Sequence, residues 1–284
     1  MKNKKVIVGI IGGTGQMGQW FKKFFEINNC EVLISGRKTK LNPIECAKQS
    51  DVVVITVPIS DTLNVIKKIA PHIRKDAAIM DLTSLKRDPV KAMLRYSKSE
   101  VVGTHPIFGP SIKTIKNQVV VLCKARGSRW FNWLKNILEK NKAKVKITTP
   151  EKHDKMMSII QGIIHFSAIS LGHTLKELNV NIDEALEYSS PVYKLRMDVI
   201  GRILNQDPKL YADIEILNPQ TNRVIREFSN STKKLRKIIK KKDTKAFVGF
   251  FNSASRHLNS FKKKASEYSD FIIEKLVEKD SKKK

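Results

Sequence analysis

The sequence predicts an α/β protein, with a doubly wound parallel sheet over residues 1–149 followed by an all-helical domain over residues 150–284. The first part alternates short β-branched runs with amphipathic stretches, the rhythm of a parallel sheet covered by helices on both faces. Beyond Thr149, strand-like runs nearly vanish and long segments with a helical period take over. The length of 284 residues suits two domains of about 100 to 200 residues each. We therefore place a domain boundary near Thr149–Pro150.

Short runs rich in Val and Ile are predicted as the strands of the sheet. Helical stretches fall between several of these runs, as the crossover connections of parallel strands require. The runs are Val6–Ile11, Glu31–Ser35, Val52–Val57, Ala77–Asp81, Val101–Thr104, Val119–Cys123 and Lys144–Ile147.

The segment Lys152–Leu178 is the most apolar helical stretch of the second part. Its apolar residues lie on most faces of the helix, which is typical of a buried helix. We expect it to form the spine of the helical domain. Because a helical half of this size can hardly cover such a segment alone, we also expect a homodimer with this helix at the interface.

The formal net charge of +27 is the unusual feature of the composition, with 54 Lys plus Arg against 27 Asp plus Glu. A basic surface favours nucleic acid because binding releases counterions from phosphate. The excess is spread along the chain, however, and no helix-turn-helix, RNA-recognition or zinc-finger pattern accompanies it. We interpret the charge as a solvated surface and expect no nucleic-acid partner.

The cysteines and the apolar runs indicate the cellular compartment of the protein. Cys30, Cys46 and Cys123 lie far apart without a CxxC pair, so we expect neither disulfides nor a metal site. A reducing, cytoplasmic location fits best. The stretch after Met1 is too short for a signal-peptide core, and no run approaches the roughly 18 apolar residues of a membrane span. We therefore expect no membrane association.

A glycine-rich turn follows the first predicted strand. The pattern GxGxxG stands between a buried strand and a helix, which is the context that the dinucleotide-binding fingerprint requires. Gly13 is expected to allow the tight turn, Gly15 the approach of a pyrophosphate, and Gly18 close packing of the helix, whose N-terminus faces the phosphates. The predicted cofactor-binding residues of this turn are Gly13, Thr14, Gly15, Gln16, Met17 and Gly18.

The end of the second strand bears on the choice between NAD and NADP. The fingerprint places an acidic residue about 20 positions after the glycines, where it holds the ribose hydroxyls of NAD. Here the sequence reads Ser35-Gly36-Arg37-Lys38. No carboxylate is present to repel a 2′-phosphate, and the Arg37 guanidinium suits that group. We expect NADP as the cofactor, with NAD as the alternative.

Three further loops follow the carboxyl ends of predicted strands, where ligands bind in sheets of this kind. Val57 and Pro58, after the third strand, are predicted to contact the cofactor. Ser84 and His105 follow the fourth and fifth strands, and both loops are expected to open onto the same crevice. His105 precedes Pro106 in a rigid turn, and a histidine there can transfer protons near neutral pH.

Polar residues recur at helical spacing in the second part. His153, Gln161 and His165 lie near one stripe of the apolar helix and need partners, which a ligand or a neighbouring helix would supply. Lys194 and Arg202 are eight positions apart on another helical stretch, again near one face. Taken singly, such basic residues are more often solvated surface charges.

With these motifs the chain resembles prephenate dehydrogenases, specifically the dehydrogenase half of the bifunctional chorismate mutase and prephenate dehydrogenase enzymes of tyrosine synthesis. The resemblance covers about Val6 to Tyr268. Because the first predicted strand begins at Val6, we expect no mutase domain ahead of it. The segments that carry the resemblance are Gly12–Gly18, Gly103–Pro110, Ile160-Gln161, His165-Phe166, Ser189–Tyr193 and Gln206–Asp213.

The resemblance implies a Rossmann-type domain followed by an all-helical dimerisation domain. It also implies the oxidative decarboxylation of prephenate to 4-hydroxyphenylpyruvate with reduction of a nicotinamide cofactor. His105 matches the catalytic residue that accepts a hydrogen bond from the ring hydroxyl and draws off its proton as hydride leaves the same carbon. Ser84 matches a serine that orients this histidine or the nicotinamide.

The resemblance further implies a set of substrate-binding residues. Arg202 matches the arginine that binds a substrate carboxylate, a task that suits a bidentate guanidinium. Lys86 matches a nearby basic residue, and Lys194 stands where close relatives carry arginine. The other matches line the same pocket in relatives: His165, Gln206 and Tyr211, the last with a part in inhibition by tyrosine, and more weakly His153.

Two other functions remain open at this point. Arogenate dehydrogenase uses the same scaffold on the aminated substrate, and nothing in the sequence excludes it. A dinucleotide-binding regulator or nucleic-acid-associated protein that has lost catalysis is favoured by the net charge but opposed by the intact His105, Ser84 and Arg202. Turnover on both substrates would separate the two dehydrogenases, and nucleic-acid binding at about 0.15 M salt would test the regulator.

Overall fold

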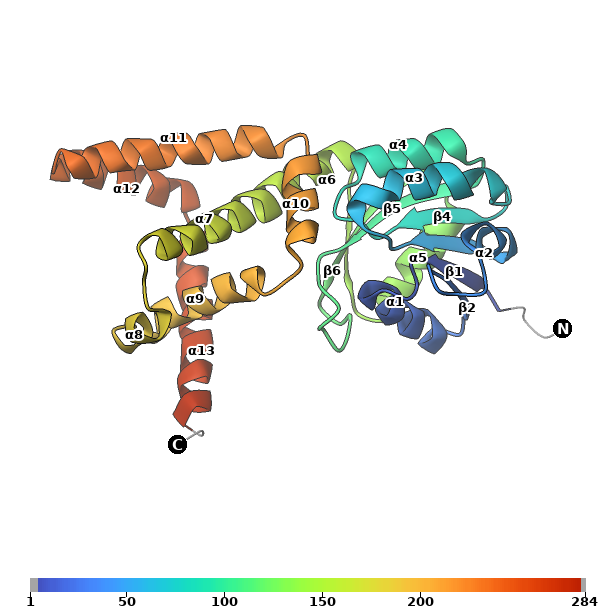
Figure 1. Ribbon diagram of the computed structural model, residues 1–284, viewed down its shortest axis with the longest axis horizontal. Coiled ribbons are helices and arrows are strands. Elements are labelled where there is room, and N and C mark those ends of the chain that lie inside the picture. The colour runs from blue at the N-terminus through green and yellow to red at the C-terminus, as the bar shows by residue number, and fades with distance from the viewer. Residues whose placement is uncertain (1–4, 282–284) are drawn as a thin grey trace. The chain divides into compact units, whose positions relative to one another are not determined.

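A computed structural model describes residues 5–281 and divides the chain into two compact units (Figure 1). The first unit contains the chain up to Ile160 together with Ala212–Gln220, and the second contains Gln161–Tyr211 and the residues from Thr221 onward. Helix α6 (Pro150–Met157) belongs to the first unit because His153, Asp154 and Met157 are buried there. The division between the units therefore follows this helix, whereas the predicted boundary near residue 149 precedes it.

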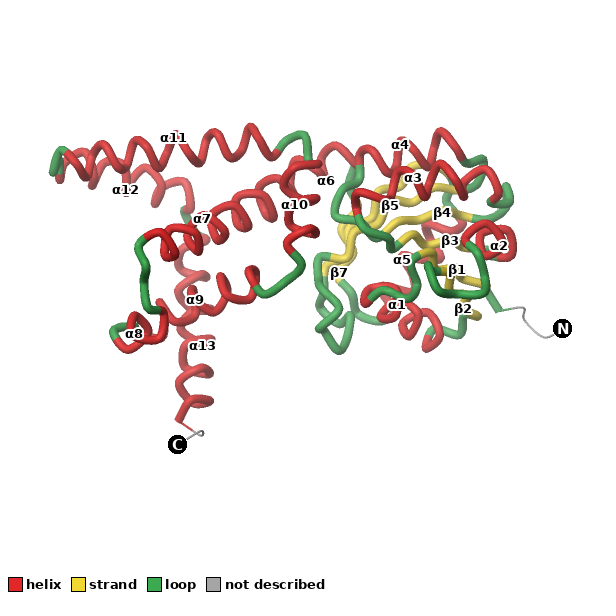
Figure 2. Tube along the Cα trace, viewed as in Figure 1, coloured by secondary structure: helices red, strands yellow, loops and turns green. Residues whose placement is uncertain are grey.

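The first unit is built on a seven-stranded sheet with the strand order β2-β1-β3-β4-β5-β6-β7 (Figure 2). The strands coincide with the predicted runs apart from a few residues at their ends. The chain reverses its direction of winding between β1 and β3, and the carboxyl ends of strands at such a point form the usual ligand crevice. The bounds are β1 Ile7–Ile11, β2 Glu31–Ser35, β3 Val52–Ile55, β4 Ala78–Asp81, β5 Glu100–Pro106, β6 Val119–Arg126 and β7 Lys144–Ile147.

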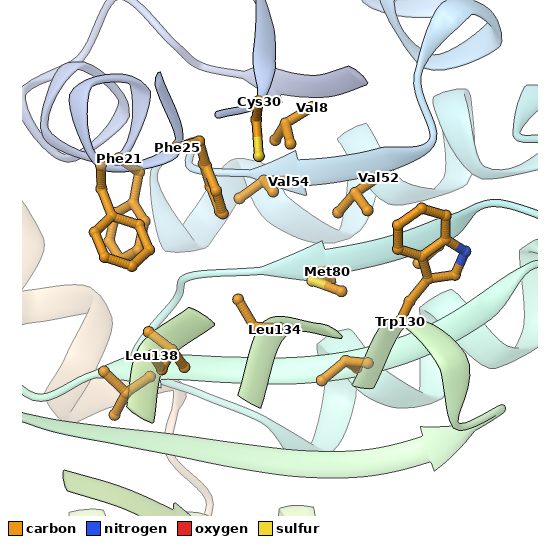
Figure 3. Packing of buried hydrophobic residues seen from close by; sticks show 14 of the residues in the cluster. Val8, Phe21, Phe25, Cys30, Val52, Val54, Met80, Trp130, Leu134 and Leu138 are labelled. Atoms are coloured by element: carbon orange, nitrogen blue, oxygen red, sulfur yellow. The ribbon is translucent and has the colours of Figure 1, made fainter. Parts of the chain in front are cut away.

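Helices cover both faces of this sheet, as predicted. Val52 and Val54 of β3 belong to one hydrophobic core, and Val53 and Ile55 to the other, because successive strand residues face opposite sides. Figure 3 shows the first core, in which Phe21, Phe25 and Leu134 pack toward the strands. The helices of the first core are α1 (Gln16–Ile27) and α5 (Arg129–Lys140); those of the second are α2 (Pro43–Gln49), α3 (Ile59–Ile69) and α4 (Arg87–Tyr96).

The sheet departs from a fully parallel arrangement at β5 and β6, which pair antiparallel. The connection between Pro106 and Val119 contains no helix, so it cannot make the crossover that a parallel pair needs. The chain instead turns back directly, and His105 pairs with Val121 in the antiparallel register. His105 consequently lies at the carboxyl end of β5, on the same edge of the sheet as the glycine-rich turn.

The described residues of the second unit form helices joined by turns and contain no strand, as the predicted all-helical domain requires. Helix α7 packs closely on α9, since a Cβ added to Gly172 would lie 2.6 Å from Cδ1 of Leu204. The helices are α7 (Ile164–Glu177), α8 (Ile182–Glu187), α9 (Pro191–Leu204), the first residues of α10 (Pro208–Leu217), α11 (Thr221–Lys240), α12 (Thr244–Leu258) and α13 (Phe261–Ser281).

The apolar stretch predicted as a buried helix differs from the expectation. A π-helical segment, Ser158–Ile163, joins α6 to α7, and Ala168 is the buried residue of α7. Ile159, Ile160 and Ile164 are 42%, 49% and 52% exposed. The single chain does not bury these residues, which corrects the prediction of a buried helix and agrees with the expectation that one helical half cannot cover this segment alone.

The sequence analysis expects no membrane-spanning segment, and the same apolar stretch departs from that expectation in its length and composition. By length and composition alone, the helical segment Pro150–Glu177 is long and apolar enough to do so, and 22% of its most apolar window is buried. That segment includes His153 and Asp154, which are buried in the first unit. Such a helix is weak evidence for a membrane span.

Candidate active site

The glycine-rich turn lies between β1 and α1. Gly12 has φ +86°, in the left-handed region, so the tight turn falls at Gly12 and not at Gly13. The N–H groups of Gly12 and Gly13 donate to the carbonyl oxygen of Ser35 over 2.7 and 3.1 Å, which ties the turn to the end of β2. A Cβ on Gly13 would lie 2.8 Å from the Ile34 side chain, and one on Gly18 would lie 2.7 Å from Cα of Gly13. Both positions therefore need glycine for packing.

The N-terminus of α1 is open and fits a pyrophosphate. Thr14, Gly15 and Gln16 are exposed. The N-cap residue, Gly15, provides no side-chain cap, and the first turn contains no acidic residue. A Cβ on Gly15 would meet only the carbonyl oxygen of Gly12, at 3.3 Å, so space remains in front of the helix. Backbone N–H groups and the positive end of the helix dipole suit an anion there. Met17 packs against the hydrophobic core instead.

The turn after β2 presents Arg37 to solvent. The Arg37 side chain is 91% exposed, and its Nη2 lies 3.8 Å from Oδ2 of Asp61 in the first turn of α3. The turn itself is held by the N–H of Gly36, which donates to Oγ1 of Thr39 over 2.9 Å. An exposed ion pair at this distance contributes little. Arg37 therefore stays accessible to a phosphate.

The loop after β3 lies against the glycine-rich turn. Thr56 donates from Oγ1 to the carbonyl oxygen of Gly12 over 3.2 Å. Val57 is half-buried against the core beneath α2, α3 and α4, whereas Pro58 is exposed at the N-cap of α3. The loop is thus placed beside the turn, with Pro58 presented outward.

The stretch Ala212–Gln220 of the first unit packs on the loops after β3 and β4. The Ser60 N–H donates to Oδ2 of Asp213 over 3.0 Å at the start of α3. Ile214 forms a small buried cluster with Ile59 and Leu85. These contacts hold the two loops that follow the neighbouring strands.

His105 begins a chain of buried polar side chains, which we call the His105 relay: His105, His153 and Asp154. Nδ1 of His105 lies 2.8 Å from Nε2 of His153, and Nδ1 of His153 lies 2.7 Å from Oδ1 of Asp154. Asp154 also accepts the backbone N–H groups of Lys86 and Arg87, over 2.8 and 2.9 Å. The relay therefore connects the end of β5 to the start of α4 through α6.

A buried ion pair stands beside the relay. Lys86 and Asp81 are fully buried, and Nζ of Lys86 donates to Oδ2 of Asp81. Thr83 places its hydroxyl 2.6 Å from the same carboxylate oxygen. Thr104 donates from Oγ1 to the Asp81 carbonyl oxygen. Lys86 was predicted to bind substrate; in the structure its ammonium group is instead occupied by Asp81.

Burial sets the protonation state of the relay. Desolvation, followed by the charges of His153 and Lys86, holds the pKa of His105 well below its usual value of 6.5. Desolvation also lowers the pKa of His153, although the hydrogen bond with Asp154 opposes the shift. Both shifts favour neutral imidazoles at physiological pH, and a neutral His105 can accept a proton. Within residues 5–281, no group of three or more His, Cys, Asp and Glu side chains is placed to hold a metal ion.

Ser84 lies in the short loop between Asp81 and Lys86, and it is half-buried. The ion pair fixes both ends of this loop. The Thr83 hydroxyl bridges its middle, within hydrogen-bond distance of Asp81 and of the carbonyl oxygen of Leu85. The loop therefore holds Ser84 in a defined position after β4.

The second unit gathers another group of the predicted residues. The rings of His165 and Tyr211 meet edge to face with centroids 4.6 Å apart. Burial raises the pKa of Tyr211, and the charge of Arg202 partly offsets this shift. Nε2 of Gln206 donates to the Arg202 carbonyl oxygen over 3.2 Å. Lys194 is exposed two turns before Arg202 on α9.

The sequence interpretation missed several residues of the first-unit site. Asp154 completes the relay, and Asp81 and Thr104 surround Lys86. For Asp154, a detectable pattern existed: an acidic residue directly follows His153 after the Thr149-Pro150 start of a helix. Nothing in the sequence pairs Asp81 with Lys86, because a buried ion pair depends on the packing of β4 against the start of α4.

Family models match both parts of the chain. A model described as the nucleotide-binding domain of prephenate dehydrogenase matches residues 32–147, and one described as its dimerization domain matches residues 149–253. A Methanocaldococcus jannaschii protein named "Probable arogenate/prephenate dehydrogenase" is 41% identical over 98% of this chain and 68% of its own length. The T-protein of Enterobacter agglomerans is 33% identical over 86% of this chain. This chain spans 65% of that T-protein.

Solved structures share the fold at low sequence identity. A prephenate dehydrogenase from A. aeolicus, solved with hydroxyphenyl propionate and NAD+, has a TM-score of 0.75 at 19% identity, covering 90% of this chain and 98% of its own. An arogenate dehydrogenase from Synechocystis has a TM-score of 0.68 at 15% identity, covering 92% and 100%. On the family models and the curated relatives, with the fold in agreement, this chain belongs to the prephenate dehydrogenase family.

Proposed function

We propose that this protein is a prephenate dehydrogenase of tyrosine biosynthesis, converting prephenate to 4-hydroxyphenylpyruvate and carbon dioxide with reduction of a nicotinamide cofactor. The observation that carries the proposal is the buried neutral His105, supported by His153 and Asp154. It lies on the same edge of the sheet as an uncapped glycine-rich turn that fits a dinucleotide. A general base on that edge suits oxidation of a ring alcohol.

Each residue has a separate proposed role in this reaction. A nicotinamide cofactor held at the glycine-rich turn would supply the acceptor for the hydride of the C–H bond at the ring carbon that carries the hydroxyl. His105 takes up the hydroxyl proton as that C–H bond breaks. The bond to the ring carboxylate then breaks, its electrons complete the aromatic ring, and the proton returns to the oxygen. Arg202 is proposed to hold a substrate carboxylate through bidentate hydrogen bonds from its guanidinium group.

The remaining predicted residues have supporting roles in this proposal. Ser84 orients His105 or the nicotinamide. Lys194 contributes positive charge near the substrate. His165, Gln206 and Tyr211 of the second unit are proposed to contact the substrate. Lys86 acts through Asp81 on the loop that carries Ser84, because its ammonium group is buried in that ion pair.

The test is a spectrophotometric assay with prephenate and each nicotinamide cofactor. We expect reduction of the cofactor with release of carbon dioxide. The second candidate substrate is arogenate, which is favoured by the name of the M. jannaschii relative. A higher kcat/KM on arogenate than on prephenate would replace the proposed substrate, and no cofactor reduction with either would reject the dehydrogenase function.

We propose NADP as the preferred cofactor, with NAD as the alternative. The end of β2 carries no carboxylate, and the exposed Arg37 is available to a 2′-phosphate. The A. aeolicus structure was solved with NAD+, which is a statement about that protein. The ratio of kcat/KM for NADP to that for NAD tests this choice, and a wild-type preference for NAD would reject the proposal.

We propose a homodimer built on the helical unit. The dimerization-domain model covers α6 to α12, and the apolar residues Ile160 and Ile164 are exposed in the single chain. Light scattering should give twice the chain mass at micromolar concentration. Ile164→Glu should weaken the dimer, whereas Ile27→Glu, at an exposed position on α1, should not. A wild-type monomer would contradict this proposal.

We propose that tyrosine competes with prephenate, since both carry a six-membered ring and a carboxylate. The His165, Tyr211 and Arg202 side chains offer an aromatic edge and a cation to such a ligand. Inhibition should raise the KM for prephenate and weaken in Tyr211→Phe. Unchanged inhibition in that variant would remove Tyr211 from the tyrosine site.

We propose a cytoplasmic location without a nucleic-acid or membrane partner. Cys30, Cys46 and Cys123 are buried free thiols, which suit a reducing compartment. Cell fractionation should recover the protein with the cytosol. Recovery with membranes, or tight binding of DNA or RNA at about 0.15 M salt, would contradict the proposal.

A further inference from the structure

His153 and Asp154 are buried next to His105, but the proposed reaction does not require either of them to touch the substrate. All three members of the His105 relay are buried, with relative exposures of 4%, 2% and 3% for His105, His153 and Asp154. They are joined by contacts of 2.8 and 2.7 Å. Buried polar groups at such distances are hydrogen-bonded in one defined direction.

The direction of the protons follows from Asp154. Its Oδ1 accepts the Lys86 N–H and its Oδ2 accepts the Arg87 N–H, at the positive N-terminal end of α4. A carboxylate can only accept, so Nδ1 of His153 must donate to it. In neutral His153 the other ring nitrogen, Nε2, is then an acceptor. His105 must therefore donate from Nδ1, which leaves its Nε2 without a proton.

We infer that His153 and Asp154 are positioning residues that hold His105 in the tautomer whose Nε2 is the base for the substrate hydroxyl. The inference rests on the proposed function and deepens it. During the reaction the substrate O–H bond breaks and an N–H bond forms at Nε2 of His105. The Nδ1–H of the resulting imidazolium still donates to His153, so its charge is stabilised through the relay by Asp154.

The charged groups around the relay are consistent with this direction. Lys86 stands beside His105, and its charge is paired with Asp81. On the neighbouring strand β6, burial raises the pKa of Cys123 to about 12, so that thiol stays neutral. Glu151 of α6 acts only at longer range, through the electrostatics of Cys123. Asp154 is thus the carboxylate in direct contact with the two histidines of the relay, through His153.

The first test removes the acceptor for the Nδ1 proton of His105. His153→Phe should lower kcat by about tenfold to a hundredfold, the usual effect of losing a partner that orients a functional histidine. The KM values for prephenate and cofactor should change little. His153→Gln, whose amide can both accept and donate, should restore most of the kcat. His72→Phe, at an exposed histidine of the same unit, is the matched control.

The second test reads the tautomer directly, without turnover. ¹⁵N NMR of histidine-labelled protein should show His105 protonated on Nδ1 at neutral pH. Asp154→Asn presents an amide that can donate, which reverses the relay and moves the proton of His105 to Nε2. The six histidines of the chain make assignment by single substitutions practical.

The outcomes separate this inference from the proposed function. A wild-type His105 protonated on Nε2, or an unchanged kcat in a folded His153→Phe, would overturn the positioning role. If the wild type turns over neither prephenate nor arogenate, the proposed function fails, and the tautomer measurement still decides whether the relay exists. If His153→Phe does not fold, the spectra of wild type and His153→Gln carry the test.

Discussion

The two groups of proposed functional residues in this protein, around His105 and around Arg202, are built in opposite ways. Around His105, every side chain of the relay is buried and has a hydrogen-bond partner. The last of them, Asp154, accepts two backbone N–H groups at the start of α4. Around Arg202 the side chains lie on helices with mostly exposed surfaces, and only Tyr211 and His165 are half-buried. A base needs one proton position and a low-dielectric surrounding, whereas a cation that holds a carboxylate must stay reachable. The difference predicts that substitutions near His105 affect turnover and stability, and that those near Arg202 affect binding.

The largest expected effect is on turnover at His105. His105→Asn should lower kcat by roughly two to four orders of magnitude, the usual contribution of general acid–base catalysis. The affinity for the cofactor should not change, because the glycine-rich turn is untouched. Steady-state kinetics and a fluorescence titration of the cofactor measure the two quantities. His72→Asn serves as the control, and a His105→Asn enzyme with wild-type turnover would remove His105 from catalysis.

The pH dependence of activity tests the same role of His105 as the base. The base must be neutral, so activity is lost as pH falls through the pKa of His105. Burial and the charges of His153 and Lys86 hold this pKa well below 6.5, so the acid limb of kcat/KM should lie well below pH 6.5. A limb near pH 6.5, or the same limb in His105→Asn, would contradict the assignment.

A large effect on stability is expected at Lys86. Lys86→Met leaves the Asp81 carboxylate buried without its partner, which should lower the free energy of unfolding by about 3–5 kcal/mol. Lys91→Met, at an exposed position of the same helix, should change it by less than about 0.5 kcal/mol. The double variant with Asp81→Leu should recover part of the loss. Denaturant unfolding measures the free energy of unfolding of each variant. Equal losses in Lys86→Met and Lys91→Met would show that the Lys86–Asp81 pair does not contribute to stability.

At Arg202 the effect should fall on binding. Arg202→Gln removes charge-assisted hydrogen bonds of about 1.5–3 kcal/mol, so the KM for prephenate should rise roughly tenfold to a hundredfold. The value of kcat should change much less, because the contact contributes in the ground state as well as in the transition state. Arg196→Gln, at another exposed arginine of α9, is the control. Equal damage to the cofactor and substrate constants would place Arg202 elsewhere.

The smallest effect is expected in cofactor choice. Arg37→Asp should shift the ratio of kcat/KM from NADP toward NAD by about tenfold, because a carboxylate repels the 2′-phosphate and accepts from the ribose hydroxyls. The Arg37 side chain has no strong partner to lose, since Asp61 is 3.8 Å away and the pair is exposed. Lys40→Asp introduces the same charge nearby as a control. An unchanged ratio in Arg37→Asp would show that this residue does not read the phosphate.

Local patterns predicted the sheet and the glycine-rich turn because those features depend on neighbouring residues. The β-branched runs gave the strands, and GxGxxG gave the dinucleotide turn, although the left-handed residue is Gly12 and not Gly13. The relay could not be predicted in the same way, because His105 and His153 are far apart in the sequence and meet only when α6 packs on β5. The apolar pattern of the helix at residues 152–178 indicates burial, but it does not say how much of that burial comes from the same chain, and part of the helix is exposed in the single chain.

The two backbone N–H groups that Asp154 accepts have a consequence for hydrogen exchange. The amide protons of Lys86 and Arg87 are covered by a buried carboxylate, so they are released only when α6 separates from the start of α4. That separation also removes His153 from His105. Slow exchange at these amides would therefore report the population of molecules in which the proposed base keeps its partner. Partial unfolding there is expected to lower activity while the rest of the sheet stays protected.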